Sequence, residues 1–225
     1  MKVLLTGHRG YIGTVLTPML LARNHSVVGM DTDLYRSCTF AGELAPVPVL
    51  EKDIRDAELD DLAGFDAIIH LAGLSNDPLG EYRPELTDEV NFRASVKLAQ
   101  LAKKAGVRRF LFASSCSSYG ASGSEFLDER ATFNPVTPYG KSKVDVELAV
   151  GPMANESFSP TFLRASTAYG LSPRIRFDLV VNNLTAWAFS RKFPPKSWAF
   201  DKNFSHAAKR RCSVLGSCAS SPTIA

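Results

Sequence analysis

Three glycines with the spacing Gly7-x-x-Gly10-x-x-Gly13 separate two segments of different hydrophobic periodicity. Residues 2–6 have the pattern of a short buried strand, and the residues from Gly13 to position 21 have that of a helix. Such glycines allow a tight turn and a close backbone approach to a pyrophosphate, which the helix N-terminus then attracts. The loop therefore predicts a dinucleotide site, and the strand and helix around it disfavour a glycine-rich turn without a ligand. The expected contacts are Gly7, Arg9, Gly10, Tyr11, Ile12 and Gly13.

An acidic residue, Asp31, ends the next apolar segment. A carboxylate at this place accepts hydrogen bonds from the adenosine ribose hydroxyls. The same charge would repel the 2′-phosphate of NADP, so NAD is the expected cofactor. Arg9 and Arg36 argue mildly for NADP, because either could meet a phosphate, but both are as well explained as solvated surface residues. Asp53 is expected either to meet the adenine amine or to cap a helix or turn.

Short apolar segments alternate with segments of helical period along most of the chain. Strands that are apolar throughout and alternate with helices predict a parallel sheet covered on both faces. The expected fold is therefore α/β, a doubly wound parallel sheet of the Rossmann type. Its strands are expected at residues 2–6, 26–30, 47–50, 67–71, 109–114 and 160–165, and its later helices at about 85–105 and 138–150.

A tyrosine and a lysine stand four residues apart in the last of these helices, so Tyr139 and Lys143 share one helix face. A tyrosine has an ordinary pKa near 10, which is too high for a base at neutral pH. A neighbouring ammonium stabilises the phenolate and lowers that pKa. The hydroxyl-rich run 114–118 follows the fifth strand, at the sheet edge where such folds bind their ligands. Because Y-x-x-x-K alone often occurs by chance, the pattern indicates a site only in this context.

Together these motifs resemble the extended short-chain dehydrogenase/reductase family, in its NAD-dependent epimerase/dehydratase branch. The resemblance covers about residues 1–190, with the motifs in the family's order. The matching pieces are the glycine loop, Asp31, Asp53-Ile54, His70-Leu71-Ala72-Gly73, Asn91, Ser114-Ser115 up to Tyr119-Gly120, Tyr139-x-x-x-Lys143, and Leu163-Arg164 up to Tyr169-Gly170.

The resemblance implies a role for each catalytic position. Tyr139 would be the general acid and base on a substrate hydroxyl, Lys143 would bind the nicotinamide ribose, and Ser115 would hydrogen-bond the reacting oxygen. An alternative for Asn91 is a polar residue inside a helix that bonds backbone. The further cofactor contacts that the resemblance implies are Asp53, Ile54, Leu71, Ala72, Gly73, Asn91 and Ser114, together with Tyr139 and Lys143.

In the family a sugar carbon is oxidised to a ketone, and the reaction then diverges. Dehydratases carry Asp-Glu directly after the catalytic hydroxyl residue, whereas this chain has Cys116 and Ser117. A thiol and a hydroxyl supply no carboxylate at neutral pH, so dehydration is disfavoured. A nucleotide-sugar epimerase and a simple sugar dehydrogenase or reductase stay open. A third alternative is an NAD-binding module or fragment without turnover.

The resemblance ends near residue 190. We expect an NAD-binding Rossmann domain at 1–170, the start of an incomplete C-terminal substrate-binding region at 171–190, and an unrecognised, loosely ordered basic tail at 191–225. The tail holds seven Lys or Arg residues and one acidic residue, although the chain's net charge is only +3. The basic excess therefore belongs to the tail, and the main body gives no support for nucleic-acid binding.

The remaining expectations concern partners and location. The sequence contains no run of about 18 apolar residues, so we expect no membrane helix. We also expect no signal peptide, because the first residues lack its pattern. The four cysteines lack metal-type spacing, so we expect reduced thiols, no metal and a cytoplasmic protein. A nucleotide-sugar substrate and a homodimer through the helices near 85–105 and 138–150 are implied by the resemblance. Alternatively, the apolar residues of these helices only cover the sheet.

Overall fold

The computed structural model describes residues 1–40, 42–75, 82–120 and 127–191. The chain divides into two compact units, Met1–Ile175 and Arg176–Ala225. Most of the residues expected to form a basic tail, 192–225, lie outside the described residues. Within the described residues, no helix is both long and apolar enough to cross a membrane.

The first unit is built on a six-stranded sheet in the order β3-β2-β1-β4-β5-β6, with every neighbouring pair parallel. This is the strand order of a dinucleotide-binding Rossmann fold, so the expected fold class is confirmed. The strands are β1 (Lys2–Thr6), β2 (Ser26–Met30), β3 (Val49–Leu50), β4 (Ala67–His70), β5 (Arg109–Ser115) and β6 (Ser159–Ala165).

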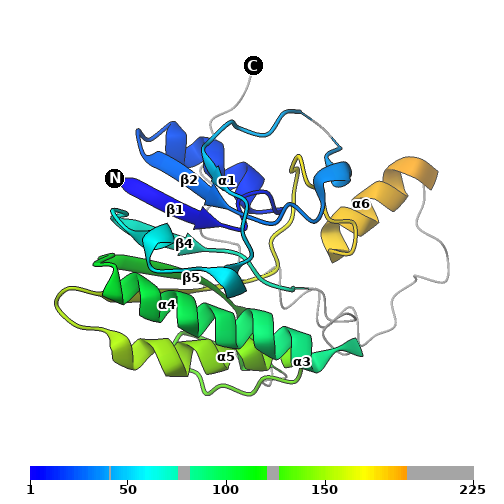
Figure 1. The fold of residues 1–225 in the computed structure, drawn as a ribbon. Coiled ribbons are helices and arrows are strands. Elements are labelled where there is room, and N and C mark those ends of the chain that lie inside the picture. The colour runs from blue at the N-terminus through cyan, green and yellow to red at the C-terminus, as the bar shows by residue number, and fades with distance from the viewer. Residues whose placement is uncertain (41, 76–81, 121–126, 192–225) are drawn as a thin grey trace. The chain divides into compact units, whose positions relative to one another are not determined.

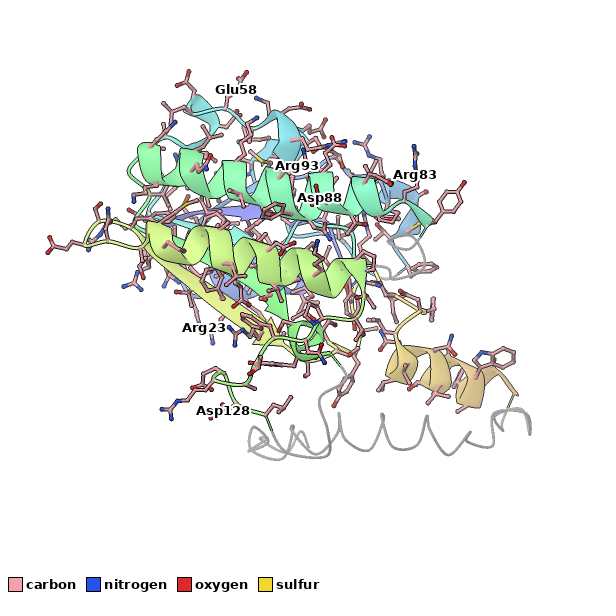
Figure 2. The ribbon with its side chains drawn as sticks, turned by 90° about the horizontal axis from the view of Figure 1, so that it is seen from below. Arg23, Glu58, Arg83, Asp88, Arg93 and Asp128 are labelled. Atoms are coloured by element: carbon pink, nitrogen blue, oxygen red, sulfur yellow. The ribbon has the colours of Figure 1, made fainter. Side chains whose placement is uncertain are left out.

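Helices cover the sheet. Figures 1 and 2 show α4 and α5 side by side over one face. The α-helices that the structure describes in this unit are α1 (Gly13–Leu21), α3 (Pro84–Thr87), α4 (Ala94–Lys104) and α5 (Pro138–Val150). Short single-turn helices join them: η1 (Arg36–Cys38), η2 (Ile54–Asp56), η3 (Asp60–Leu62), η5 (Cys116–Tyr119) and η6 (Gly151–Met153).

The expected helix at 85–105 is interrupted. A π-helical segment, η4 (Asp88–Arg93), lies between α3 and α4. Apolar spacing reports which face of a helix is buried and does not distinguish an extra residue in one turn, so the sequence could not predict this. The helix ends as expected, because Gly106 follows it with φ +79 and Val107 N–H bonds back to the Ala102 carbonyl.

Buried apolar residues from both the strands and the helices form the core between the sheet and α4 and α5. Leu4, Ile68, Phe110 and Leu98 are all fully buried in it. A buried histidine joins three elements inside this core. His70 of β4 contacts Thr6 Oγ1 of β1 at 2.6 Å and Ser95 Oγ of α4 at 2.8 Å. Burial and the charge of Lys143 lower the pKa of His70 to about 3, so the ring is neutral.

The described part of the second unit contains α6 (Val180–Arg191). Two side-chain amides satisfy backbone carbonyls just before it. Asn182 Nδ2 donates to the Arg176 carbonyl at 2.9 Å, and Asn183 Nδ2 donates to the Phe177 carbonyl at 2.8 Å. These bonds fix the entry into the helix.

Candidate active site

The glycine loop joins β1 to α1 and leaves no room for side chains at two of its glycines. Gly7 has φ +70, and a Cβ there would lie 2.7 Å from the backbone nitrogen of Ala72. A Cβ on Gly13 would lie 2.3 Å from the Gly7 carbonyl oxygen. Helix, loop and the end of β4 therefore pack backbone against backbone, as a loop that admits a pyrophosphate requires.

No side chain caps the start of α1. Ile12, which precedes the helix, makes no side-chain capping bond and is 45% exposed. Tyr11 donates its hydroxyl to the Gly170 carbonyl at 2.8 Å, so its ring ties the loop to the segment after β6. An uncapped helix start beside glycines without space for Cβ atoms fits the diphosphate of a dinucleotide.

Asp31 lies at the end of β2, against the glycine loop. Its two carboxylate oxygens accept bonds from the backbone N–H groups of Arg9, at 2.9 Å, and Asp33, at 2.8 Å. The guanidiniums of Arg9 and Arg36 both contact the Asp33 carboxylate, at 3.0 and 3.1 Å. The two arginines that argued for NADP are therefore already paired with an acid.

The segment after β4 lies directly beside the glycine loop. Leu71 N–H bonds the Thr6 carbonyl, and the Ala72 N–H contacts Thr6 Oγ1 at 3.3 Å. Asn91, which is 1% exposed, bonds both the N–H and the carbonyl of Leu74, each at 2.7 Å. A Cβ on Gly73 would lie 3.0 Å from Asn91 Oδ1. Asn91 therefore fixes the backbone of this segment, in line with the alternative of a polar helix residue bonding backbone.

Two expected cofactor contacts, Asp53 and Ile54, lie after β3. Asp53 caps η2 by accepting from Arg55 N–H at 2.9 Å, and it pairs with the Arg55 guanidinium. The Arg55 bond is the largest influence on Asp53 and lowers its pKa, although burial opposes it. Ile54 is 5% exposed and its side chain belongs to the core. A ligand could therefore meet Ile54 through its backbone.

The hydroxyl-rich segment continues from β5 into η5. Ser115 is the last residue of the strand and caps η5, because its Oγ accepts from the Ser117 N–H at 3.1 Å. Ser114 is buried and donates to Glu147 of α5. The two adjacent serines therefore point in different directions, and Ser114 turns to α5.

Helix α5 brings Tyr139 and Lys143 to this segment. Thr137 caps the helix by accepting from Gly140 N–H at 3.0 Å, and Pro138 opens its first turn. A Cβ on Gly140 would lie only 2.8 Å from the Ser117 carbonyl oxygen. The start of α5 is therefore held against η5, and the predicted residues Ser115 and Tyr139 are on adjoining elements.

Lys143 is buried beneath Tyr139. Its Nζ donates to the Ala113 carbonyl at 2.7 Å and lies 4.4 Å from the centre of the Phe112 ring. The same Nζ is 5.3 Å from the centre of the Tyr139 ring. Burial lowers the pKa of Lys143 to about 8, so most of the ammonium is charged at neutral pH.

An ion pair behind these residues was not predicted from the sequence. Glu147 accepts from Arg164 of β6 at 2.6 Å, and Arg164 also donates to Tyr119 Oη at 2.8 Å. The Glu147 side chain is 4% exposed. The sequence held a signal for Glu147. Tyr139, Lys143 and Glu147 are spaced four residues apart, so all three share one face of the helix.

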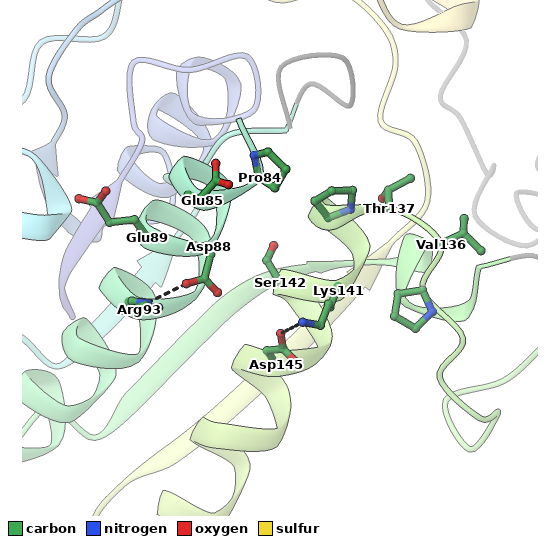
Figure 3. A pocket seen from close by; sticks show the side chains of 12 residues that line it. Pro84, Glu85, Asp88, Glu89, Arg93, Val136, Thr137, Lys141, Ser142 and Asp145 are labelled. Carbon is green, nitrogen blue, oxygen red and sulfur yellow. Dashed lines mark hydrogen bonds and ion pairs between the residues drawn. The ribbon is translucent and has the colours of Figure 1, made fainter. Parts of the chain in front are cut away.

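A groove of about 800 Å³ lies between residues of α3 and η4 and the start of α5 (Figure 3). Its lining includes Asp88 of η4 and Lys141 and Asp145 of α5. A smaller cavity of about 350 Å³ lies against Arg9, Asp33 and other residues near β2. The described residues include no group of His, Cys, Asp or Glu side chains that could hold a metal ion.

The chain matches the model of the NAD dependent epimerase/dehydratase family over residues 3–192. A UDP-glucose 4-epimerase of Mycolicibacterium smegmatis is 33% identical over 162 residues, which cover 69% of this chain and 52% of that protein. An uncharacterized UDP-glucose epimerase of Bacillus subtilis is 29% identical over 199 residues, or 82% of this chain and 61% of that one. The chain spans about half the length of the curated relatives it matches.

Solved structures give the same picture. An NAD-dependent NDP-hexosamine 5,6-dehydratase of tunicamycin biosynthesis, TunA, aligns with TM-score 0.74 and 27% identity, over 84% of this chain and 62% of that one. MoeE5 in complex with UDP-glucose and NAD aligns with TM-score 0.70 and 27% identity, over 83% and 60%. The resemblance predicted from the motifs is thus confirmed.

Proposed function

Because this chain belongs to the NAD dependent epimerase/dehydratase family, whose model covers residues 3–192, we propose that it is an NAD-dependent epimerase of a nucleotide sugar. One observation carries the proposal: Ser115, Tyr139 and the buried Lys143 lie on adjoining elements. They lie at the carboxyl ends of the strands, the same edge of the sheet as the glycine loop. The relatives named as UDP-glucose 4-epimerases support the epimerase over other members of the family.

Residues of this chain would hold NAD at the strand ends. The backbone of Gly7 to Gly13 and the start of α1 would bind the diphosphate, and Asp31 would accept from the adenosine ribose. Leu71, Ala72 and Gly73, fixed by Asn91, would line the cleft beside them. Asp53 and Ile54 would flank the adenine, and Ser114 would fix α5 through Glu147. When bound, NAD supplies the acceptor and the donor of a hydride.

The chemistry of the chain's own groups is proton transfer. Tyr139 Oη would take the proton of a sugar hydroxyl while a ketone forms transiently at that carbon, and would return it afterwards. The ammonium of Lys143 stabilises the tyrosine anion and would also bond the nicotinamide ribose. Ser115 Oγ would donate to the oxygen that carries the changing charge.

Two residues of η5 favour epimerisation over dehydration. Cys116 and Ser117 follow Ser115 where dehydratases need an acidic pair, and no residue of η5 is a carboxylate. A thiol and a hydroxyl are both already protonated at neutral pH, so neither is a ready base for the carbon-bound proton that a water elimination removes. The ketone would therefore be reduced again from the other face, which inverts the carbon.

The test is incubation of the purified chain and NAD with UDP-, GDP- and dTDP-sugars, followed by chromatography of the sugar and absorbance of NADH. An inverted C4 centre without net NADH supports the epimerase. Oxidised sugar with stoichiometric NADH would instead identify a dehydrogenase. NAD binding without turnover of any sugar would contradict an enzymatic role for this chain.

We also propose that the chain is a homodimer through α3, η4, α4 and α5. The groove of Figure 3 is lined by residues of both helical segments, and Leu148 of α5 is 62% exposed. A second copy would cover this leucine. Sedimentation should give a dimer that Leu148→Arg converts to a monomer, whereas Leu59→Arg, at a leucine 44% exposed elsewhere, should not. A monomeric wild-type chain would contradict the proposal.

The proposed location is the cytoplasm. Cys38 and Cys116, the cysteines that the structure describes, both carry free thiols. Reduced thiols are the usual state in a cytoplasmic protein.

A further inference from the structure

Asp33 gathers three arginines around one carboxylate at the end of β2. Its Oδ2 accepts from Arg9 Nη1 at 3.0 Å and from Arg36 Nε at 3.1 Å. Its Oδ1 accepts from Arg174 Nη2 at 2.9 Å. The Asp33 side chain is only 7% exposed, so its ion pairs are buried at the acidic end and differ from solvent-exposed pairs, which contribute little.

The arginines differ in what else they can reach. Arg174 is 5% exposed and also bonds Thr39 Oγ1 at 2.8 Å, so it is fixed within the fold. Arg9 and Arg36 are 19% and 73% exposed, and their further acidic partner is Glu51, at 3.4 and 3.6 Å. Arg9 and Arg36 are therefore the two cations that could turn to a ligand.

Asp33 is adjacent to the carboxylate proposed to meet the adenosine ribose. Its own N–H donates to Asp31 Oδ1, and the Arg9 N–H donates to Asp31 Oδ2. Arg9 thus bonds Asp31 through its backbone and Asp33 through its guanidinium, which links the proposed ribose contact to the arginine cluster that a 2′-phosphate would attract. Burial by itself would raise the pKa of Asp33, but bonds from Arg174 and Arg36 outweigh it and lower the pKa, which keeps the carboxylate charged.

We propose that Asp33 determines the preference for NAD over NADP by occupying Arg9 and Arg36. The preference then has two components. Asp31 repels a 2′-phosphate directly, and Asp33 withholds the guanidiniums that would otherwise bind it. This inference rests on the proposed NAD site. Asp33 would act on cofactor preference through Arg9 and Arg36, without touching cofactor or substrate itself.

The test is titration calorimetry of NAD and NADP, without sugar, on wild type and Asp33→Asn. Asparagine suits the position because Asp33 has φ +52, a conformation that Asn tolerates. The NADP dissociation constant should fall about 10-fold, the effect of one or two charged hydrogen bonds to phosphate, while that of NAD changes less than about 3-fold. Adding Arg9→Ala and Arg36→Ala to Asp33→Asn should remove the gain.

Asp178→Asn is the control, because it breaks another Asp–Arg pair, with Arg176, in the second unit. It should leave the affinity for NADP unchanged. An Asp33→Asn chain that binds NAD as the wild type does but shows no gain for NADP would overturn the inference and leave the proposed function standing. Wild-type protein that binds no NAD would overturn both.

A second measurement covers the case that Asp33→Asn fails to fold, since Arg174 would lose a buried partner. In the wild-type background, Arg36→Ala should leave NADP binding unchanged within about 3-fold, because Asp33 already occupies that side chain. A loss of about 10-fold would show that Arg36 binds the phosphate despite Asp33, which would refute the inference.

Discussion

The Nζ of Lys143 lies 5.3 Å from the centre of the Tyr139 ring while it donates to the Ala113 carbonyl at 2.7 Å. A strand carbonyl, and not a carboxylate, thus fixes the ammonium beneath the tyrosine. Among the described residues no negative charge offsets the burial of Lys143, whose pKa falls to about 8 for that reason. The group that the proposed chemistry needs is therefore held at a cost in stability.

This cost predicts a stabilised variant, Lys143→Met. Because the folded pKa is about 8 and the ordinary value 10.5, at roughly 1.4 kcal/mol per pH unit the burial penalty is about 3 kcal/mol below pH 8. Lys143→Met also leaves the Ala113 carbonyl without its hydrogen bond, which costs about 1 kcal/mol. The variant should therefore be more stable than the wild type by about 2 kcal/mol at pH 7. Urea unfolding measures it.

The stability of the wild type should depend on pH through Lys143. The unfolded chain binds one more proton than the folded chain between about pH 8 and 10.5, so the wild type should gain stability relative to Lys143→Met through that window. The advantage of the variant should therefore shrink from pH 7 to pH 10. An advantage that is constant over this range would contradict the assigned origin of the penalty.

Glu147→Gln should destabilise the first unit by roughly 2–3 kcal/mol, because it leaves the Arg164 guanidinium of β6 without its buried charged partner. Asp88→Asn is the control, since it breaks the exposed contact with Arg93 and should cost less than about 1 kcal/mol. Thermal unfolding compares the two. Equal effects would show that the Glu147 pair does no more than a surface pair.

Asn91→Ala should loosen the segment after β4. It removes both bonds to the Leu74 backbone, which predicts a loss of about 2–3 kcal/mol and a weaker affinity for NAD. Hydrogen exchange should show faster exchange of the Leu74 amide. Gln100→Ala, at an exposed position on the adjoining helix α4, should leave that amide unchanged. Unaltered Leu74 protection in Asn91→Ala would refute the positioning role.

Gly13→Ala should abolish NAD binding, because the new Cβ would stand 2.3 Å from the Gly7 carbonyl oxygen and 2.6 Å from His8 Cα. Because both neighbours are backbone atoms, the loop itself would have to move, away from the close approach that the diphosphate needs. Gly151→Ala is the control, because the Cβ added there would have its nearest neighbour, on the Phe162 ring, at 3.8 Å. This variant should bind NAD normally. Calorimetry decides, and undiminished binding by Gly13→Ala would contradict the loop's assignment.

Much of the fold follows from local patterns. The apolar segments correspond to the six strands, with differences at the ends: β4 stops at His70, one residue earlier than expected, and β5 runs on to Ser115. The strand expected at 47–50 reduces to Val49–Leu50, because pairing with β2 extends over only two residues. Strand ends depend on the neighbouring strand, which lies far away in sequence.

The site was predictable where spacing along one element carries the information. Tyr139 and Lys143 share a helix face, and the glycines require a tight turn. Partnerships across elements were not predictable, because they depend on tertiary packing. Nothing in the sequence around Arg9 and Arg36 indicates that both side chains contact Asp33. Nor does it indicate that Ser114 bonds Glu147.

The central claim is that Tyr139 transfers the proton in an NAD-dependent inversion of a nucleotide sugar. Nuclear magnetic resonance of UDP-sugars incubated with NAD and either wild type or Tyr139→Phe tests it most directly, with NAD affinity measured in parallel. The account predicts a C4-inverted product from the wild type and at least about 100-fold less from Tyr139→Phe, with NAD bound equally by both. Equal rates of inversion in the two proteins would contradict it.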